Sequence, residues 1–329
     1  MTLEPPFCYQ LLERSGQRFA FLPWYSHLDE AEASAVRNEP GGSTEESNPT
    51  DFLIRHSALD LRICLSQSEL LLLHEETIPD RVAELRDSIQ RDGVVKDPII
   101  VDADSCVVLD GMHRVVALRE LCCLRMPVCV VDYLNPSIKV GVWYRTLTGR
   151  VTSAQFETAL LSSGIKVERF SPDMTTMTEN SSLAALFAGG ESLLLESSGT
   201  RAYEVLKIAE RCARELRLTV AFETEQDAIK KLMNGMTDAI ITLPKIDKAS
   251  IRTAGLTGRL LPHKVTRHII PARPLMVNIP VSTLTDETTT LREANEHFVA
   301  RLRTRGMIQK PAGTVIEGRR YEEETYIFN

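Results

Sequence analysis

The stretch VVLDGMHRVVAL, residues 107–118, suggests how the chain around it is organised. Apolar residues lead into Asp110-Gly111, and a run with helical spacing begins at His113-Arg114, so we predict a strand, a tight turn and a helix N-terminus. Such a turn presents backbone N–H groups, the positive end of a helix dipole and a glycine that permits close approach, and this combination binds phosphate. The alternative is an ordinary glycine turn with an arginine salt bridge.

Composition limits the classes of protein to consider. The chain has 329 residues, enough for two domains with separate cores, and its net charge of −7 argues against a nucleic-acid binder that relies on bulk electrostatics. No apolar run is long enough to span a membrane, and the N-terminus lacks a signal peptide, so we expect a cytoplasmic protein. The seven cysteines show no zinc-binding spacing.

Residues 1–60 form an N-terminal extension whose second half is rich in Glu, Ser, Pro and Gly, as in a mobile linker. Its first half carries Phe19, Phe21 and Trp24, which are candidates to pack on the main body. From Leu61 onward, short strands and helices alternate closely to about residue 147, and this spacing predicts a compact α+β core domain.

The second half reads as another α/β domain, residues 148–284. Its clearest element is an amphipathic helix over 203–216, and Gly189-Gly190 separates two short apolar segments as in a hairpin. Residues 171–182 are expected to form a loop. Residues 285–329 are predicted to be a C-terminal helical extension that begins with an apolar helix stripe, and we expect this tail to serve as a docking or homodimer surface. The stripe consists of Leu291, Ala294, Phe298, Leu302 and Met307.

Residues 74–133 resemble the core of the ParB/sulfiredoxin superfamily, and the turn separates three of its branches. Sulfiredoxins carry a cysteine directly before the His-Arg pair, where this chain has Met112. Chromosome-partitioning ParB proteins have Gly-Glu-Arg-Arg there and a basic helix-turn-helix after it, and neither is found here. Free L-serine kinases have His-Glu, then Asp-Gly-x-His-Arg, then Trp-Tyr; this chain has His74-Glu75, residues 110–114 in that pattern, and Trp143-Tyr144.

A further segment, residues 261–271, resembles the Pro-Lys-Thr-Thr-Arg-His segment of the same kinases. Lys264, Thr266, Arg267 and His268 match it. His263 and Val265 depart from it, because the proline has moved and one hydroxyl is missing. The resemblance spans roughly residues 60–285 and implies a ParB/sulfiredoxin-like core domain followed by the second α/β domain.

The resemblance implies phosphorylation of free L-serine to O-phospho-L-serine, with Mg²⁺ and either ATP or ADP as donor. Glu75 matches the family's catalytic carboxylate; as an alternative it is a helix-capping or surface glutamate. Asp110 is expected to hold Mg²⁺ or to orient the turn, unless it only caps the helix through an Asx-turn. The expected nucleotide phosphate site is made of Gly111, Met112, His113 and Arg114.

The resemblance also implies a serine and phosphoserine site in which Trp143 forms a wall and residues 264–268 bind the anionic groups. Its expected residues are Trp143, Lys264, Thr266, Arg267 and His268. We expect the segment to reach across from the second domain, with an arginine fork that suits an oxyanion. The alternatives are a core tryptophan and a surface basic patch. His74 is expected to be structural.

Two other functions remain open at this point. One is a nucleotide-switched binding protein of the ParB type without catalysis, which the acidic composition and the retention of Glu75 disfavour. The other is a kinase for another small hydroxyl amino acid, which the departure at Val265 keeps open. The expected partners are the nucleotide and a small-molecule substrate, with no nucleic acid and no membrane.

Overall fold

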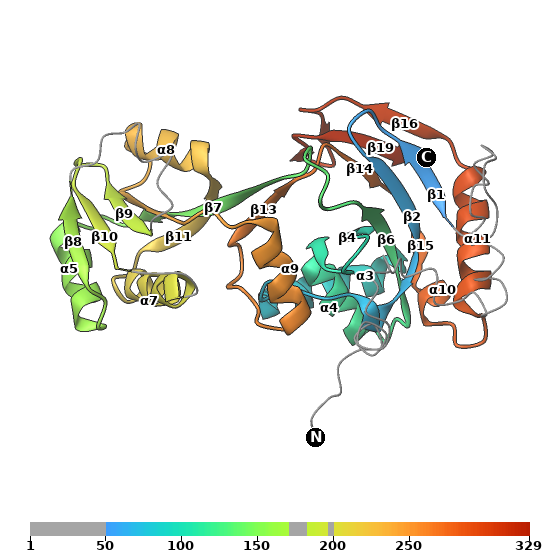
Figure 1. The fold of residues 1–329 in the computed structure, drawn as a ribbon, viewed down its shortest axis with the longest axis horizontal. Coiled ribbons are helices and arrows are strands. Elements are labelled where there is room, and N and C mark those ends of the chain that lie inside the picture. Colours follow the sequence, from blue (N-terminus) through green and yellow to red (C-terminus); the bar gives the residue numbers. More distant parts are fainter. Residues whose placement is uncertain (1–50, 171–182, 197–200) are drawn as a thin grey trace, which may run out of the picture. The chain divides into compact units, whose positions relative to one another are not determined.

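The computed structural model describes residues 51–170, 183–196 and 201–329. The predicted mobile linker and loop 171–182 lie outside these residues, as do Phe19, Phe21 and Trp24. The chain forms two compact units (Figure 1). The first comprises the described residues up to Lys139 together with Arg252–Leu260 and Ile269–Asn329, and the second comprises Val140–Ile251 and Leu261–His268.

A five-stranded sheet forms the centre of the first unit, in the order β1-β2-β6-β4-β5. Only the β4–β6 pair is parallel; the other neighbours are antiparallel. The strands are β1 (Phe52–Arg55), β2 (Asp60–Gln67), β4 (Ile99–Asp102), β5 (Val108–Asp110) and β6 (Arg125–Val131). Every residue of β4 and β6 is buried, as expected of central strands.

Two helices of the first unit begin and end where local sequence signals place them. Helix α3 (Pro79–Asp92) has proline in its first turn and ends at Gly93, whose φ of 68° is left-handed. Val82 and Ile89 are its buried residues. Helix α4 (Met112–Glu120) packs against α3. A 3₁₀ turn (Ser68–Leu70) and the short strand β3 (Val94–Val95) complete this part of the unit.

Most of the apolar stripe of the C-terminal extension lies in the core of the first unit. Helix α11 (Leu291–Arg303) buries Ala294, Phe298 and Leu302. The side chain of Asn295 accepts a hydrogen bond from the N–H of Leu65 in β2 and donates one to its carbonyl. Leu65 lies beyond the residues of β2 that pair with β1. The stripe is therefore already occupied within its own unit. Met307 differs, since it is exposed in a strand.

The predicted C-terminal helical extension also contains strands. These are β16 (Met307–Lys310), β17 (Val315–Ile316), β18 (Arg319–Arg320) and β19 (Glu324–Phe328). Strand β19 lies between β16, to which it is antiparallel, and β14 (Ala272–Leu275), to which it is parallel. Strand β15 (Ile279–Pro280) pairs with β3, and helix α10 (Val281–Thr285) follows it.

The second unit is built on a seven-stranded sheet, ordered β11-β7-β12-β9-β10-β8 with β13 also paired to β7. Its strands are β7 (Lys139–Thr148), β8 (Val167–Phe170), β9 (Ala184–Phe187), β10 (Ser192–Leu195), β11 (Thr219–Thr224), β12 (Ala239–Thr242) and β13 (Thr266–Ile269). Its helices are α5 (Ser153–Ser162), α7 (Arg201–Glu215) and α8 (Glu225–Met233); α9 (Lys248–Thr257) spans the boundary between the units in the chain.

The boundaries of the units differ from the predicted 61–147 and 148–284. Strand β7 is in the second unit because its partners β11, β12 and β13 all come from later in the chain, so Trp143 is in that unit too. Residues 269–284 return to the first unit because β14 and β15 pair there. Strand pairing is a long-range property, and local patterning does not reveal it.

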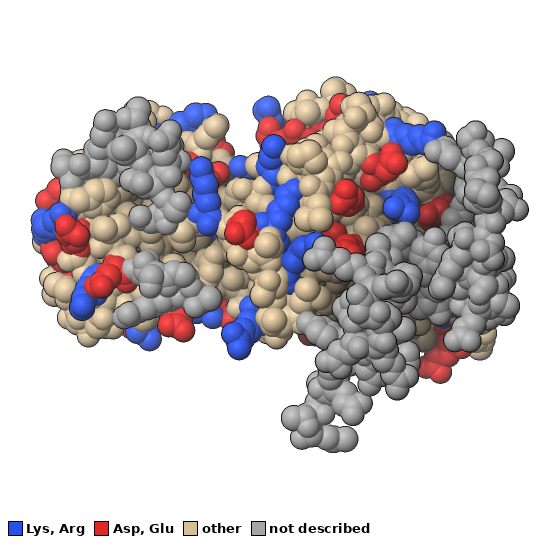
Figure 2. Space-filling model, in the orientation of Figure 1, with Lys and Arg blue, Asp and Glu red and all other residues tan. Residues whose placement is uncertain are grey.

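Among the described residues, no helix combines the length and the apolar character needed to cross a bilayer. Around α5 and β8, acidic and basic side chains alternate on the surface (Figure 2), and Arg169 pairs there with both Glu157 and Glu191. That part of the second unit therefore presents balanced charge rather than a basic patch.

Candidate active site

The predicted strand, turn and helix form as expected at residues 110–114. Asp110 ends β5, Gly111 follows with a φ of 100°, and α4 begins at Met112. A Cβ on Gly111 would lie 3.0 Å from Nη1 of Arg114 and 3.3 Å from Cγ1 of Ile99, so only glycine fits without strain. Gly111 is also the N-cap and provides no side-chain acceptor for the first turn of α4. A helix N-terminus of this kind favours an anion through its dipole and its outward N–H groups.

The two side chains expected to bind phosphate also fasten the turn to its surroundings. Nη1 of Arg114 donates to the carbonyl of Pro98 at 2.9 Å. Nε2 of His113 accepts a hydrogen bond from the backbone N–H of Ile78 at 3.0 Å. A ring nitrogen that accepts carries no proton, so His113 is a neutral imidazole here rather than a cation. Arg114 is the cation of this pair.

Asp110 forms an ion pair with a residue that the sequence analysis missed. Nη1 of Arg273 donates to Oδ2 of Asp110 at 2.9 Å. Burial raises the pKa of the Asp110 carboxyl, but the charges of Arg273, Arg114 and Arg319 outweigh that effect and hold the pKa at about 2. Asp110 therefore stays ionised. It does not cap α4, so the Asx-turn alternative is wrong.

Arg273 is held by acidic side chains on both sides. Its side chain is 10% exposed, and its Nε forms a close ion pair with Glu323 in addition to the bond to Asp110. Burial alone lowers the pKa of Arg273, but the charges of Asp110 and Glu323 together raise it by more, so the net shift is upward. The sequence signal for Arg273 is a charged residue between two prolines in the apolar run 269–279. Such a residue needs a buried partner.

Glu75 is buried, at 3% exposure, so the surface-glutamate alternative is wrong. It lies in the segment before α3, where Leu72 makes a parallel bridge with Val107. Nδ1 of His74 donates to the carbonyl of Val108 at 2.7 Å, which ties this segment to the strand that leads into the turn. Burial lowers the pKa of His74 to about 4, although that hydrogen bond acts in the opposite direction. His74 is thus neutral and structural in place, as expected.

In the second unit, three of the predicted serine-site residues lie together. Nζ of Lys264 is 5.0 Å from the centre of the Trp143 ring, and the Arg267 guanidinium carbon is 5.9 Å from it. The ring face therefore carries two cations, which is the arrangement of a cation–π contact. Trp143 is only half-buried, so it is not a simple core residue.

Glu225, the first residue of α8, was not predicted and completes this group. Its Oε2 is 3.8 Å from Nη2 of Arg267. A Cβ at Gly141 would lie 3.2 Å from that carboxylate oxygen and 3.3 Å from the same Nη2, so this glycine leaves space for both side chains. We call Gly141, Trp143, Glu225, Lys264 and Arg267 the Trp143 cluster. Nothing in the local sequence distinguishes Glu225 from a glutamate that begins a helix.

Arg267 keeps an unused hydrogen-bond donor. Its Nε is buried and has no hydrogen-bond partner among the described residues, and its ion pair with Glu225 is longer than a hydrogen bond. A buried donor without a partner costs free energy, on the order of 1–3 kcal/mol. An oxyanion beside Arg267 would remove that cost.

The serine-site role predicted for Thr266 and His268 remains a prediction. Side chains alternate between the faces of a strand, so in β13 these two lie on the face opposite to Arg267. Thr266 is buried. Val265, the apparent departure from the serine-kinase segment, is fully buried, and an apolar residue suits that position.

A buried arginine fixes the loop before β13. Nε of Arg145 donates to Oε1 of Glu210 at 2.7 Å, and Nη1 donates to the carbonyls of Trp143 and Lys264 at 2.7 and 2.8 Å. Nη2 donates to the carbonyl of His263 at 3.0 Å. Lys264 has a positive φ of 59°, a conformation that these bonds hold in place. Arg145 therefore holds the backbone at His263 and Lys264.

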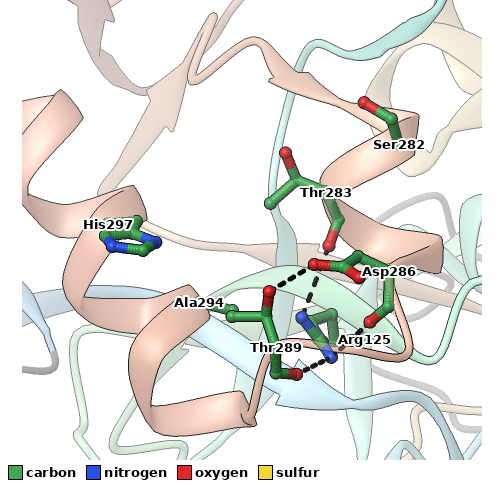
Figure 3. A pocket seen from close by; sticks show the side chains of 7 residues that line it. All are labelled: Arg125, Ser282, Thr283, Asp286, Thr289, Ala294 and His297. Atoms are coloured by element: carbon green, nitrogen blue, oxygen red, sulfur yellow. Dashed lines mark hydrogen bonds between the residues drawn. The ribbon is translucent and has the colours of Figure 1, made fainter.

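A separate cavity of about 530 Å³ in the first unit contains none of the predicted site residues (Figure 3). Arg125 lies at its base and donates to the carbonyls of Asp286 and Thr289 at 2.8 and 2.6 Å. Hydrogen bonds from Thr288 and Thr289 hold the pKa of Asp286 at about 2. These bonds shape the loop between α10 and α11, so Arg125 and Asp286 already bond to other groups of the protein.

Comparison with solved structures identifies the fold. A solved structure of a free serine kinase in complex with AMP has the same fold, with a TM-score of 0.59 at 19% identity over 68% of this chain and 93% of that chain. The chain therefore has the free serine kinase fold, an α+β fold, as predicted.

Curated proteins give the more particular relationship. An ATP-dependent L-serine kinase of Staphylothermus marinus is 29% identical over 65% of this chain and 88% of that protein. The ADP-dependent L-serine kinase SerK of Thermococcus kodakarensis is 21% identical over 64% and 88%, and a ParB-like protein of Sulfolobus acidocaldarius is 26% identical over 60% and 84%. No family profile matches the chain. The chain is a relative of the L-serine kinases, as the motifs predicted.

Proposed function

We propose that this protein is a nucleotide-dependent L-serine kinase that converts serine to O-phospho-L-serine. The observation that carries the proposal is the N-terminus of α4 directly behind Gly111, in a chain whose relatives are L-serine kinases. Phosphoryl transfer requires positioning and charge neutralisation more than covalent chemistry from the protein. In this proposal, the first unit binds the nucleotide and the second unit binds serine.

In the first unit, Glu75 is the proposed general base. It accepts the proton of the serine hydroxyl as the serine Oγ–P bond forms and the bond to the leaving nucleotide breaks. Its burial beside the neutral His74 holds the carboxylate in one place. The backbone N–H groups at the start of α4 and the Arg114 guanidinium meet the phosphate oxygens, while Gly111 permits the close approach.

In the second unit, the Trp143 cluster has the charges that a zwitterionic amino acid needs. Arg267 and Lys264 bind the serine carboxylate, and the unused Nε of Arg267 supplies one donor. Glu225 binds the serine ammonium group, and the Trp143 ring forms a wall. Thr266 and His268 support β13 from its other face rather than contact serine.

Magnesium enters on the nucleotide phosphates in this proposal. Among the described residues, no three His, Cys, Asp or Glu side chains group closely enough to hold a metal ion. Asp110 is ionised but shares its charge with Arg273, so it fits a role in orienting the turn better than one as a metal ligand. Both ATP and ADP remain proposed donors, since the relatives include kinases named for each.

We place the enzyme in the cytoplasm. The described cysteines, Cys64, Cys106, Cys122, Cys123, Cys129 and Cys212, are all free thiols. Burial raises the pKa of Cys123 to about 11 and that of Cys129 to about 12, with a small opposing effect of Arg273 on Cys129. Such thiols are unreactive packing groups, as is common in a reducing compartment.

The direct test is to incubate the full chain with Mg²⁺, serine and either ATP or ADP, and to look for phosphoserine by ³¹P NMR. The expected result is phosphoserine with at least one donor. The ParB-like relative supports a second function, a nucleotide-switched binding protein. Nucleotide binding without any phosphoserine would favour that second function. Faster turnover of homoserine or threonine than of serine would favour a kinase for another hydroxyl amino acid.

A further inference from the structure

The C-terminal hairpin β17–β18 brings an additional arginine to the 110–114 turn. The hairpin lies after residue 285, where the resemblance to the serine kinases ends. It belongs to the same compact unit as the turn. Glu323, just after the hairpin, pairs with Arg273, and Arg273 pairs with Asp110, the first residue of the turn. A direct series of contacts therefore joins the hairpin to the turn.

Tyr321 places Arg319 in this arrangement. The Tyr321 ring is buried, and the guanidinium carbons of Arg319 and Arg273 lie 4.8 and 5.9 Å from its centre. Stacking on a fixed ring restrains a side chain that would otherwise have many rotamers, so Arg319 is pre-organised. Arg319 is itself exposed, and its positive charge is one of those that lower the pKa of Asp110.

Two other cations near the turn, Arg114 and Arg273, already bond to acceptors of the protein, whereas Arg319 makes no ion pair with a described residue. Arg114 donates to the Pro98 carbonyl, and Arg273 lies between two carboxylates. Within the part of the chain that the structure describes, no carboxylate lies within salt-bridge distance of Arg319. Its neighbour Arg320 is different, because its Nε is 3.0 Å from Oε1 of Glu322.

We propose that Arg319 binds a phosphate group of the nucleotide held at the 110–114 turn, and so extends the phosphate site with a cation from the C-terminal hairpin. This inference rests on the proposed nucleotide-dependent function. The ligand class is a nucleoside di- or triphosphate, whose multiple negative charges a single helix N-terminus does not neutralise. The planar guanidinium, stacked on Tyr321, suits bidentate contact with phosphate oxygens.

Calorimetry on the full chain tests the inference with ATP, ADP and adenosine. Arg319→Ala should weaken ATP and ADP binding by roughly 5- to 20-fold, as expected for one partly exposed charge-assisted contact, and leave adenosine binding unchanged. Arg319→Lys should recover part of the loss. Arg320→Ala is the matched control, since strand alternation places it on the other face of the hairpin, and its nucleotide affinity should equal that of the wild type.

The outcomes separate this inference from the proposed function. Wild-type protein that binds neither nucleotide would overturn both. Wild-type binding with an Arg319→Ala variant of equal affinity would overturn this inference alone. Equal weakening of adenosine and ADP, or equal effects of Arg319→Ala and Arg320→Ala, would also overturn it, because the effect would then not concern the phosphate. A normal melting temperature of Arg319→Ala is expected, given that the side chain is exposed.

Discussion

The 110–114 turn of the first unit and the Trp143 cluster of the second differ in how their side chains are bonded. The side chains of the turn are bonded to neighbouring protein groups, whereas the cluster keeps a buried donor without a partner among the described residues. In the turn, Asp110 pairs with Arg273, Arg114 donates to a carbonyl, and the His113 ring accepts a backbone hydrogen bond. In the cluster, Arg267 and Lys264 lie over the Trp143 ring, and Arg267 has a buried Nε without a hydrogen-bond partner among the described residues.

In the proposed function, this difference separates how the two ligands are recognised. The side chains of the turn fix its conformation, and the turn presents backbone N–H groups at a helix start together with the Arg114 guanidinium, which suit any phosphate. The cluster presents side chains of both signs, which suit a ligand with a carboxylate and an ammonium group. The turn would therefore bind nucleotides by their shared phosphates, and the cluster would select the acceptor.

The largest expected effect comes from Glu75→Gln, which keeps the shape of the buried side chain and removes its charge. We expect kcat to fall by about 10²–10⁴-fold, the usual contribution of a general base, with nucleotide affinity close to that of the wild type. Initial-rate kinetics and calorimetry measure the two quantities. Glu76→Gln is the control, because Glu76 is the adjacent glutamate and is only half-buried. A Glu75→Gln variant of near-normal rate would exclude Glu75 as the base.

Arg267→Ala tests the cluster as the site of the acceptor. The loss of a charge-assisted fork, worth roughly 1.5–3 kcal/mol, should raise the serine KM by about 10- to 100-fold without changing the nucleotide Kd. Serine kinetics and nucleotide calorimetry on the same preparation are needed, together with a thermal melt. If the melt is normal and the serine KM is unaltered, serine binds elsewhere.

Glu225→Gln should give a smaller effect that depends on the ligand. Removing the partner of the serine ammonium group should raise the serine KM by about 3- to 10-fold, since a half-buried charge pair is worth less than a fully buried one. Turnover of an acceptor without an amino group, such as hydroxypropionate, should be unaffected by the substitution. Asp227→Asn is the control, because Asp227 is in the same first turn of α8 and bonds to Thr224. Equal changes for both acceptors would mean that Glu225 only supports Arg267.

The smallest effect concerns pH and tests whether the turn is a fixed charge frame. The pKa of Asp110 is depressed from 3.8 to about 2. Its ion pair with Arg273 therefore stabilises the fold fully above about pH 4, and this stabilisation is lost as the pH falls toward 2. Asp110→Asn should therefore change the nucleotide Kd by the same factor at pH 5 and at pH 8. A factor that disappears at pH 5 would show that Asp110 titrates there and that Arg273 does not hold it ionised.

The local parts of the first unit were predictable. Alternating apolar residues, Gly111 and the helical spacing after it act over a few neighbouring residues, and they produce β5, the turn and α4 in any context that buries their apolar faces. The same holds for the proline start and the glycine end of α3. The resemblance identified the fold and relatives because its motifs consist of such contiguous segments.

The electrostatic partners were decided only by tertiary structure. Arg273 meets Asp110 across 163 positions of sequence, and it does so because β14 is held beside β19 in the first unit. Glu225 reaches Arg267 because β11, which precedes α8, and β13 both pair with β7. Hydrophobic periodicity specifies which face of an element is buried, but it does not specify which charged residues the buried faces bring together. The sequence alone therefore determined the turn, while long-range packing determined the charge on Asp110, the burial of Glu75 and the composition of the Trp143 cluster.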